Sequence, residues 1–107
     1  MSFSARLSEL GIELPEVAAP LASYIPAKRT GNYVYTSGQL PLVGGELIAA
    51  GKVGAEVDEA TAQECARACI LNALAAVAAV VGGLDNIRSI VKVVGFVASD
   101  PSFSGQP

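Results

Sequence analysis

The sequence predicts one domain of the α/β or α+β class, in which a β-sheet carries a long helix on one face. Residues 32–37 alternate in side-chain type as a strand does, and residues 59–81 have the apolar spacing of a helix. Residues 87–98 are again rich in β-forming side chains. A chain of 107 residues has the size of a single domain, which we place at residues 1–107, and can bury a core.

The N-terminal part is predicted to hold a short helix and then an irregular segment. Ser2 or Ser4 can cap the helix, and Gly11 is suited to end it. Residues 12–32 contain three of the six prolines, and proline cannot donate to a sheet ladder. We therefore expect this segment to be irregular or to lie at a sheet edge.

Two turns are predicted around the first strand. Residues 30–32, Thr-Gly-Asn, precede a strand over 32–37, in which Tyr33 and Tyr35 lie on one face. Residues 43–46, Val-Gly-Gly-Glu, have the composition of a hairpin turn, so residues 47–50 are expected to form a short returning strand.

The best-defined element is the helix that follows. Asp58 is a good N-cap, and Gly82-Gly83 should end the helix near residue 81. Small apolar side chains recur at intervals of three and four, which predicts one face packed closely on the sheet. This predicted stripe consists of Ala62, Cys65, Ala66, Cys69, Ala73, Val77 and Val80.

Residues 87–98 are predicted to form a largely buried strand, with Gly95 marking a bulge or a close backbone approach. Asp100-Pro101 could cap and begin a second helix. The other face of the sheet has no predicted cover within the chain. Because a bare, half-apolar sheet face is a liability, we expect another subunit to cover it.

Composition excludes several classes of site. The chain has no histidine, which removes Ser-His and Cys-His catalysis and most zinc sites. Its net charge is −3 and its seven basic residues are scattered, so a nucleic-acid partner is not expected. Cys65 and Cys69 lack a second pair that would complete a metal site. We interpret them as small core residues in a reducing, cytoplasmic protein, with a redox or metal role as the alternative.

No membrane segment is predicted. The N-terminus lacks the apolar core of a signal peptide. Residues 68–84 are the one apolar run, but they are shorter than the roughly 20 residues of a span, contain Asn72 and close on two glycines. We interpret this run as a buried helix of a soluble protein.

The motifs together resemble a known family. The stretch RTGNYVYTSGQLPLVGGEL, then GKVG, an Ala-rich helix and GGLDNIRSIVKVVGFV, is similar to the Rid/YjgF family. These proteins, such as RidA, are imine/enamine deaminases, also known as translation-initiation inhibitors or L-PSP endoribonucleases. The opening, ARLSELGIELPEVAAPLASYIPAKRTGN, resembles a divergent branch. The likeness covers nearly the whole chain, and its most specific part is the strand end S-G-Q-[IL]-P.

The resemblance implies a chorismate-mutase-like α+β fold, with helices packed on one face of the sheet. It implies a homotrimer with ligand sites between subunits, which would cover the bare sheet face. It also implies a hydrolase that converts reactive enamines or imines to a keto acid and ammonia. The expected ligand is a small metabolite that bears a carboxylate, and no metal or organic cofactor is implied.

The resemblance also points to four site residues. Ser37, Gly38 and Gln39 match the strand-end motif, and Tyr24 matches an upstream tyrosine of the family. Ser37 would donate to substrate, Tyr24 would form a wall, and Gly38 would permit a tight turn. On the residues alone, Ser37 could instead bond its own backbone, and the tyrosines, Tyr35 included, could be interface residues.

The chain departs from the family in one respect. The family's arginine on a late strand grips the substrate carboxylate, and a nearby glutamate positions water. Neither segment lies within residues 1–107, so no catalytic residue is identifiable and the family's second helix and final strands are also missing. Arg29, Arg67 and Arg88 match no such motif, and we interpret Arg67 as solvated. The chain is then a fragment of a longer protein or a homologue that has lost the arginine.

Three functions follow as hypotheses. The first is imine/enamine deamination with Tyr24 and Ser37 in the cleft. The second is a trimer of the same fold that binds a small metabolite without turnover. The third is RNA cleavage or translation inhibition, which the acidic balance and the absence of a basic stripe disfavour.

Overall fold

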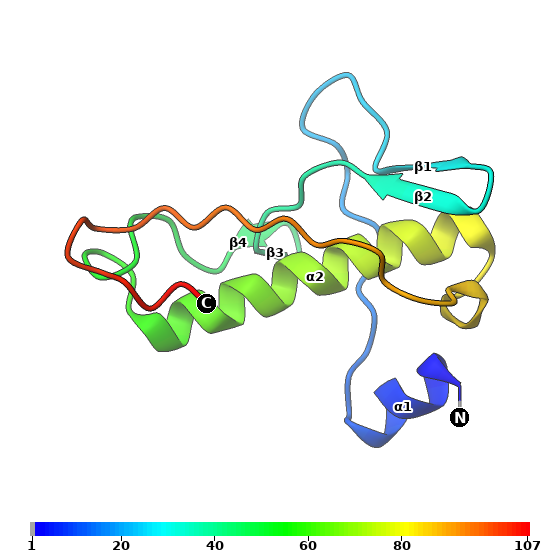
Figure 1. The fold of residues 1–107 in the computed structure, drawn as a ribbon, viewed down its shortest axis with the longest axis horizontal. Helices are drawn as coiled ribbons and strands as arrows, with labels where there is room; N and C mark the ends of the chain where they lie inside the picture. Colours follow the sequence, from blue (N-terminus) through cyan, green and yellow to red (C-terminus); the bar gives the residue numbers. More distant parts are fainter. Residues whose placement is uncertain (1) are drawn as a thin grey trace.

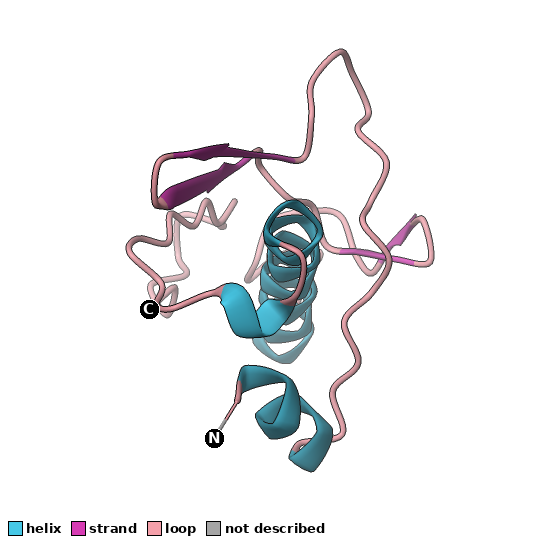
Figure 2. Ribbon diagram, turned by 90° about the vertical axis from the view of Figure 1, so that its right-hand side faces the viewer, coloured by secondary structure: helices cyan, strands magenta, loops and turns pink. Residues whose placement is uncertain are grey.

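The computed structural model of the protein describes residues 2–107 as an α+β fold of two helices, one 3-10 turn and two small hairpins (Figure 1). The elements in chain order are α1 (Phe3–Glu9), β1 (Ala27–Thr30), β2 (Tyr33–Thr36), β3 (Leu42–Val43), β4 (Glu46–Leu47), α2 (Glu59–Val81) and η1 (Leu84–Asn86). The long helix α2 is the centre of the fold. Figure 2, which looks along α2, shows the two hairpins and α1 arranged around it.

The first hairpin confirms the predicted strand and turn. β1 pairs antiparallel with β2, with Ala27 opposite Thr36 and Thr30 opposite Tyr33. The turn between them holds Gly31 at φ 57°, a left-handed conformation that favours glycine. Residues 12–32 were expected to be irregular or to lie at a sheet edge. Residues 27–30, which follow the last proline of this segment, form an edge strand with β2 as its partner.

The second hairpin is present as predicted, although it is shorter. Gly44 and Gly45 have φ values of 60° and 83°, the conformation that a tight two-residue hairpin turn requires. Leu42 pairs with Leu47, and Val43 pairs with Glu46. The returning strand therefore covers two residues, Glu46–Leu47, and not residues 47–50.

Helix α2 begins and ends where the sequence predicts. The Asp58 carboxylate accepts a hydrogen bond from the Thr61 N–H at 2.7 Å and caps the first turn. Gly82 ends the helix at φ 84°, and its N–H donates to the Ala78 carbonyl.

Replacing Gly82 by alanine is expected to lower the free energy of unfolding by about 1 kcal/mol. An added Cβ would meet no atom closer than 3.7 Å, so the cost comes from the left-handed backbone and not from a clash. Urea denaturation of the variant and of the native protein measures this change in the free energy of unfolding. Gly95→Ala is the matched control because Gly95 is not left-handed and its Cβ would meet open space. Equal destabilisation by both substitutions would contradict this account of the cap.

The buried face of α2 differs from the predicted stripe by about a quarter turn around the helix axis. The residues that are buried on α2 are Ala68, Asn72, Ala75 and Ala76. The predicted stripe is half-buried at most positions, and Ala66 and Val80 are exposed. Small apolar residues occur almost all round this helix, so periodicity alone does not select the face. The contacts with β1, β2 and β3 select it.

Residues 87–98 are not a buried strand, which corrects the sequence prediction. The segment runs back along α2 as extended chain (Figure 1), and Phe96 is 94% exposed. Backbone hydrogen bonds hold its two ends. The Ile87 N–H donates to Leu84 O at 3.1 Å; at the other end the Val53 N–H donates to Ala98 O and the Asp100 N–H donates to Val53 O, both at 2.9 Å. A strand needs a neighbour to complete its ladder, and the described residues supply none beside this segment.

The second helix that Asp100-Pro101 could begin is a turn in this structure. The Asp100 carboxylate accepts hydrogen bonds from the N–H and the hydroxyl of Ser102. The N–H of Phe103 donates to the Asp100 carbonyl at 2.9 Å, which closes the turn. The hydrogen bonds of a helix N-cap are therefore present, but residues 103–107 do not continue as a helix.

The single chain leaves much apolar surface open. Its accessible surface is 7681 Å², whereas a folded protein of this mass exposes about 5,500 Å². Its radius of gyration is 14.8 Å, against about 13 Å for a typical domain of this length. Six apolar residues are buried among residues 2–107, and four of them are alanines. The core is thus thin, and its large side chains lie at the surface.

One helix among residues 2–107, α2, is long and apolar enough to cross a membrane. This is weak evidence, because the core helix of a soluble protein passes the same test. The buried Asn72 lies at its middle and bonds to the β3 region of the same domain.

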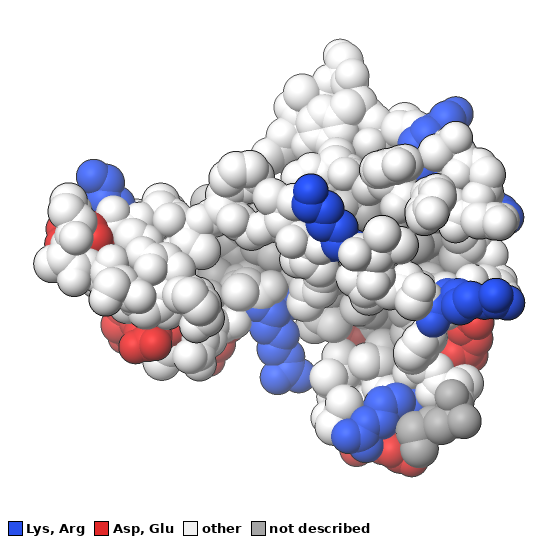
Figure 3. All heavy atoms as spheres, viewed as in Figure 1, with Lys and Arg blue, Asp and Glu red and all other residues white. Residues whose placement is uncertain are grey.

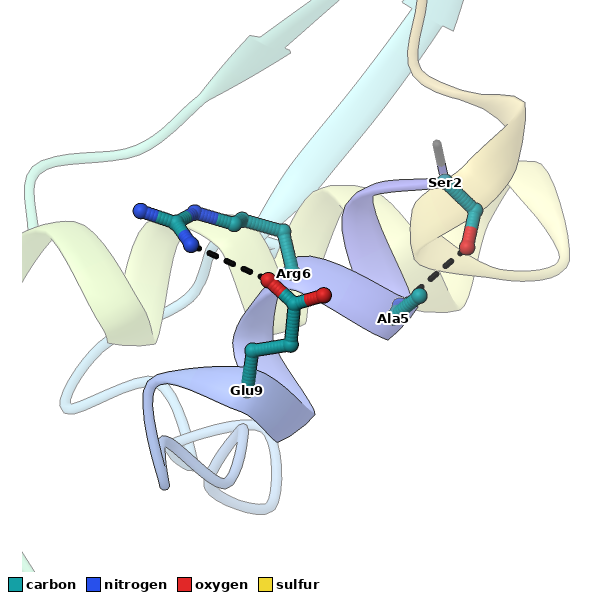
Figure 4. Close-up of polar contacts among 4 residues, drawn as sticks. All are labelled: Ser2, Ala5, Arg6 and Glu9. Carbon is teal, nitrogen blue, oxygen red and sulfur yellow. Dashed lines mark hydrogen bonds and ion pairs between the residues drawn. The ribbon is translucent and has the colours of Figure 1, made fainter.

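Helix α1 forms as predicted and docks through one carboxylate. The Ser2 hydroxyl accepts from the Ala5 N–H at 3.1 Å, and Arg6 pairs with Glu9 at 3.0 Å (Figure 4). The Ser4 N–H donates to Asp85 Oδ1 at 2.8 Å, and the Ser4 hydroxyl donates to Asp85 Oδ2. Asp85 belongs to η1, so this contact joins α1 to the turn that follows α2.

We expect the docking of α1 to weaken at acidic pH. The two hydrogen bonds from Ser4 lower the pKa of Asp85 below its ordinary value. Their contribution is therefore fully present above about pH 4 and is lost as the pH falls through the lowered pKa. Hydrogen exchange of the α1 amides, followed by NMR from pH 6 downward, measures this. In Asp85→Ala the protection should already be low at pH 6; unchanged protection would contradict the docking role.

Candidate functional site

The four residues that the sequence singles out lie around one small hollow at the end of β2. Tyr24, Ser37, Gly38 and Gln39 all line it, together with the segment 18–21. Its volume is about 20 Å³, which is room for about one water molecule. The proline-rich segment before β1 thus folds back over the strand end, and residues 13 positions apart meet.

Ser37 is held at the mouth of the hairpin. Its N–H donates to the Pro26 carbonyl at 2.9 Å, and its hydroxyl donates to the same oxygen at 3.3 Å. The alternative that Ser37 bonds its own backbone is wrong, since its partner lies 11 residues earlier. Ser37 is half-buried. A ligand with a better acceptor can therefore accept the hydrogen bond of the Ser37 hydroxyl, because the Ser37 N–H still donates to the Pro26 carbonyl.

Gln39 brings an amide to the serine. Its Nε2 lies 3.5 Å from both the carbonyl oxygen and the hydroxyl of Ser37. The amide carries two donors and one acceptor, so the pair offers several hydrogen-bonding atoms to a polar ligand. Ser37 and Gln39 both belong to the short link between β2 and β3, which connects the first hairpin to the second.

Tyr24 forms the opposite wall. Its hydroxyl lies 3.5 Å from the Leu21 N–H, across the bend that carries both residues. The residue is 45% exposed and lines the hollow. Tyr35 is 65% exposed on β2 and is not among the residues that line the hollow.

The expected role of Gly38 needs correction. Gly38 does not adopt a left-handed conformation, and an added Cβ would meet no atom within 4 Å. The backbone turns here without a conformation that only glycine reaches. The absence of a side chain at Gly38 leaves that side of the hollow open, and this is the role that the geometry supports.

Asn72 is the residue that sequence reasoning missed. Its Nδ2 donates to the carbonyls of Leu40 and Leu42, at 3.1 and 3.0 Å, and the residue is 3% exposed. Leu40 and Leu42 also line the hollow, so α2 fixes the far side of the S-G-Q-L-P stretch through this one amide. A polar residue in the middle of an apolar helix was the available signal, because buried amides require partners.

Cations and metal ligands are not gathered at this hollow. Figure 3 shows lysine and arginine side chains scattered over one face without a basic stripe. Arg29 donates to the Gly31 carbonyl at 3.0 Å and so supports the first turn. Within residues 2–107 no three metal-ligating side chains come together. The cysteines are half-buried and unpaired, and burial together with nearby Cys65 raises the pKa of the Cys69 thiol.

Comparison with known proteins decides the family. The family described as "YjgF/chorismate mutase-like, putative endoribonuclease" matches residues 4–107. The chain belongs to the YjgF/chorismate mutase-like family. The resemblance found from the S-G-Q-L-P motif is thus confirmed, and so is the α+β class of fold.

Three relatives of this YjgF-family chain are informative. Protein TCP17 of Trypanosoma cruzi is 40% identical over 105 residues, which are 96% of this chain and 64% of that protein. The crystal structure of protein Atu1372 from Agrobacterium tumefaciens has a TM-score of 0.83 and 46% identity, with 95% of this chain and 62% of that chain covered. A structure described as a "putative endoribonuclease" from Shewanella oneidensis MR-1 has a TM-score of 0.73 and 37% identity, with 78% of this chain and 56% of that chain covered.

The chain spans less than two thirds of the length of each of these relatives. The relatives therefore have residues with no counterpart between positions 1 and 107. The family's carboxylate-binding arginine and its glutamate remain unassigned in this chain.

Proposed function

We propose that the protein hydrolyses reactive enamines or imines to a keto acid and ammonia, at a site built around the hollow of Ser37. The observation that carries the proposal is that the Ser37 hydroxyl and the Gln39 amide lie 3.5 Å apart at the end of β2, in a hollow that Tyr24 also lines. These groups can orient a small polar substrate and its attacking water. The choice of reaction rests on the resemblance of the S-G-Q-L-P stretch to imine/enamine deaminases, within the YjgF family to which the chain belongs.

The proposal includes a homotrimer with the site completed between subunits. A hollow of about 20 Å³ is too small for a substrate. The chain also exposes about 2,000 Å² more than a folded protein of its mass, well above the roughly 800 Å² that each partner buries in a standard interface. A neighbouring subunit would enlarge the site and cover apolar surface. A group from outside residues 1–107 would hold the substrate carboxylate.

Ammonia release tests the reaction. An amino-acid oxidase generates the imine in the presence of the native protein, and ammonia is followed against a blank without protein. We expect the rate to rise above the blank in proportion to protein concentration. A rate equal to the blank at every concentration would overturn the proposal. Light scattering of the same sample tests the trimer.

The alternative is a trimer that binds a small carboxylate metabolite without turnover. It predicts saturable binding of a keto acid by calorimetry and no ammonia release. The family description also names an endoribonuclease, and incubation of the protein with RNA checks that activity. The net charge of −3 and the scattered cations do not favour it.

A further inference from the structure

A second hollow lies against α2, and the proposed reaction does not use it. It has a volume of about 290 Å³ and lies between α2, the β3–β4 hairpin and the segment around Pro15. This is close to the lower size of small-molecule sites in proteins. Its apolar lining comes from Pro15, Leu42, Val43, Ile48, Ala68 and Leu71. We call this hollow the α2 groove.

Charged groups of both signs line the same groove. Glu64 and Arg67 lie one turn apart on α2, and Glu13 approaches from the segment that follows α1. None of the three forms an ion pair within residues 2–107, where Arg6–Glu9 is the ion pair present. The groove thus offers two carboxylates and one guanidinium, all three free for a ligand.

Asn72 adds a buried acceptor to the groove. Both hydrogen bonds of its side chain use Nδ2, and Oδ1 accepts none from the described residues. Every fully buried side-chain nitrogen or oxygen in this part of the chain has a partner. Oδ1 therefore keeps some contact with solvent although the residue is 97% buried, and the α2 groove is the hollow that Asn72 lines. A ligand that donates a hydrogen bond would satisfy it.

We propose that the α2 groove binds an apolar α-amino acid as a zwitterion. The carboxylate of the ligand pairs with the Arg67 guanidinium. The ammonium of the ligand pairs with the carboxylates of Glu13 and Glu64 and donates a hydrogen bond to Asn72 Oδ1. Its aliphatic side chain packs on the leucine, valine and isoleucine lining. A ligand with one charge leaves at least one of these groups without a partner, so the pattern selects for both charges. The proposal does not depend on the deaminase activity.

Calorimetric titration of the native protein with L-leucine tests the proposal. We expect L-leucine to bind saturably. Isopentylamine and 4-methylpentanoate, which each lack one of its charges, should bind at least about tenfold more weakly. Arg67→Gln and Glu64→Gln should each weaken L-leucine binding about tenfold. Arg88→Gln is the matched control, because Arg88 is exposed and lies outside the groove. The affinity of this variant for L-leucine should be unchanged.

Two further results separate this site from the first hollow. Ser37→Ala should leave L-leucine binding unchanged, whereas loss of binding would place the leucine at the Ser37 hollow and overturn the proposal. Absence of saturable heat up to millimolar leucine, or equal affinity for isopentylamine, would also overturn it. Failure of the ammonia assay has no bearing on this titration, so the two proposals stand or fall separately.

Discussion

Asn72→Leu is expected to lower the free energy of unfolding by about 2–3 kcal/mol, the largest effect on stability that we predict for a single side chain. The leucine has a similar volume but cannot donate, so the carbonyls of Leu40 and Leu42 lose the amide that now lies 3.0–3.1 Å away. Partly buried acceptors without partners cost more than the net gain of a hydrogen bond. Urea denaturation of the native protein measures the loss.

Asn86→Ala provides the control for this substitution. Asn86 Nδ2 also donates to a carbonyl, that of Val81 at 2.8 Å, but the bond is exposed and water can replace it. Its loss should cost less than about 1 kcal/mol. If the two variants were equally destabilised, burial would not be the source of the Asn72 effect, and the link between α2 and the S-G-Q-L-P stretch would be weaker than the geometry indicates.

Ser37→Ala is expected to lower ammonia release from an oxidase-generated imine about tenfold or more, with little change in stability. The substitution removes the one hydroxyl that lies between Pro26 and Gln39 at the end of β2. The Pro26 carbonyl keeps its bond from the Ser37 N–H at 2.9 Å, so the backbone should hold its path. Rates are measured at matched protein concentration, and the melting temperature is recorded for each variant.

Ser89→Ala is the matched control for that measurement, because Ser89 is exposed and lies away from the hollow. It should retain the full rate. A full rate in Ser37→Ala would remove the serine from the proposed mechanism while leaving the reaction itself open to the native-protein assay. A folded Ser37→Ala that still binds a keto acid with unchanged affinity would also count against the placement of the substrate.

Local chemistry made several elements predictable. Asp58 and Gly82 mark the two ends of α2 because a carboxylate cap and a left-handed glycine satisfy helix termini without help from the rest of the fold. The glycines at positions 31, 44 and 45 fix both hairpin turns in the same way. The S-G-Q-L-P motif led to the family, which the comparison with residues 4–107 confirmed.

The failed predictions concern contacts between distant segments. Residues 87–98 have a strand-like composition, but a strand exists only with a neighbour, and none lies beside this segment. The buried face of α2 was misplaced because alanines surround the helix and periodicity could not choose among them.

The sequence by itself determined the ends of α1 and α2, the two hairpin turns, the family and, through the family resemblance, four candidate site residues. Each of these depends on interactions between near neighbours in the chain, or on a motif that such interactions constrain. Tertiary structure decided which face of α2 is buried, that Asn72 holds the Leu40 and Leu42 carbonyls, and that Glu13 joins Glu64 and Arg67 around the α2 groove. These features join residues 30 to 54 positions apart, and only the packing of the hairpins and the N-terminal segment on α2 brings them together.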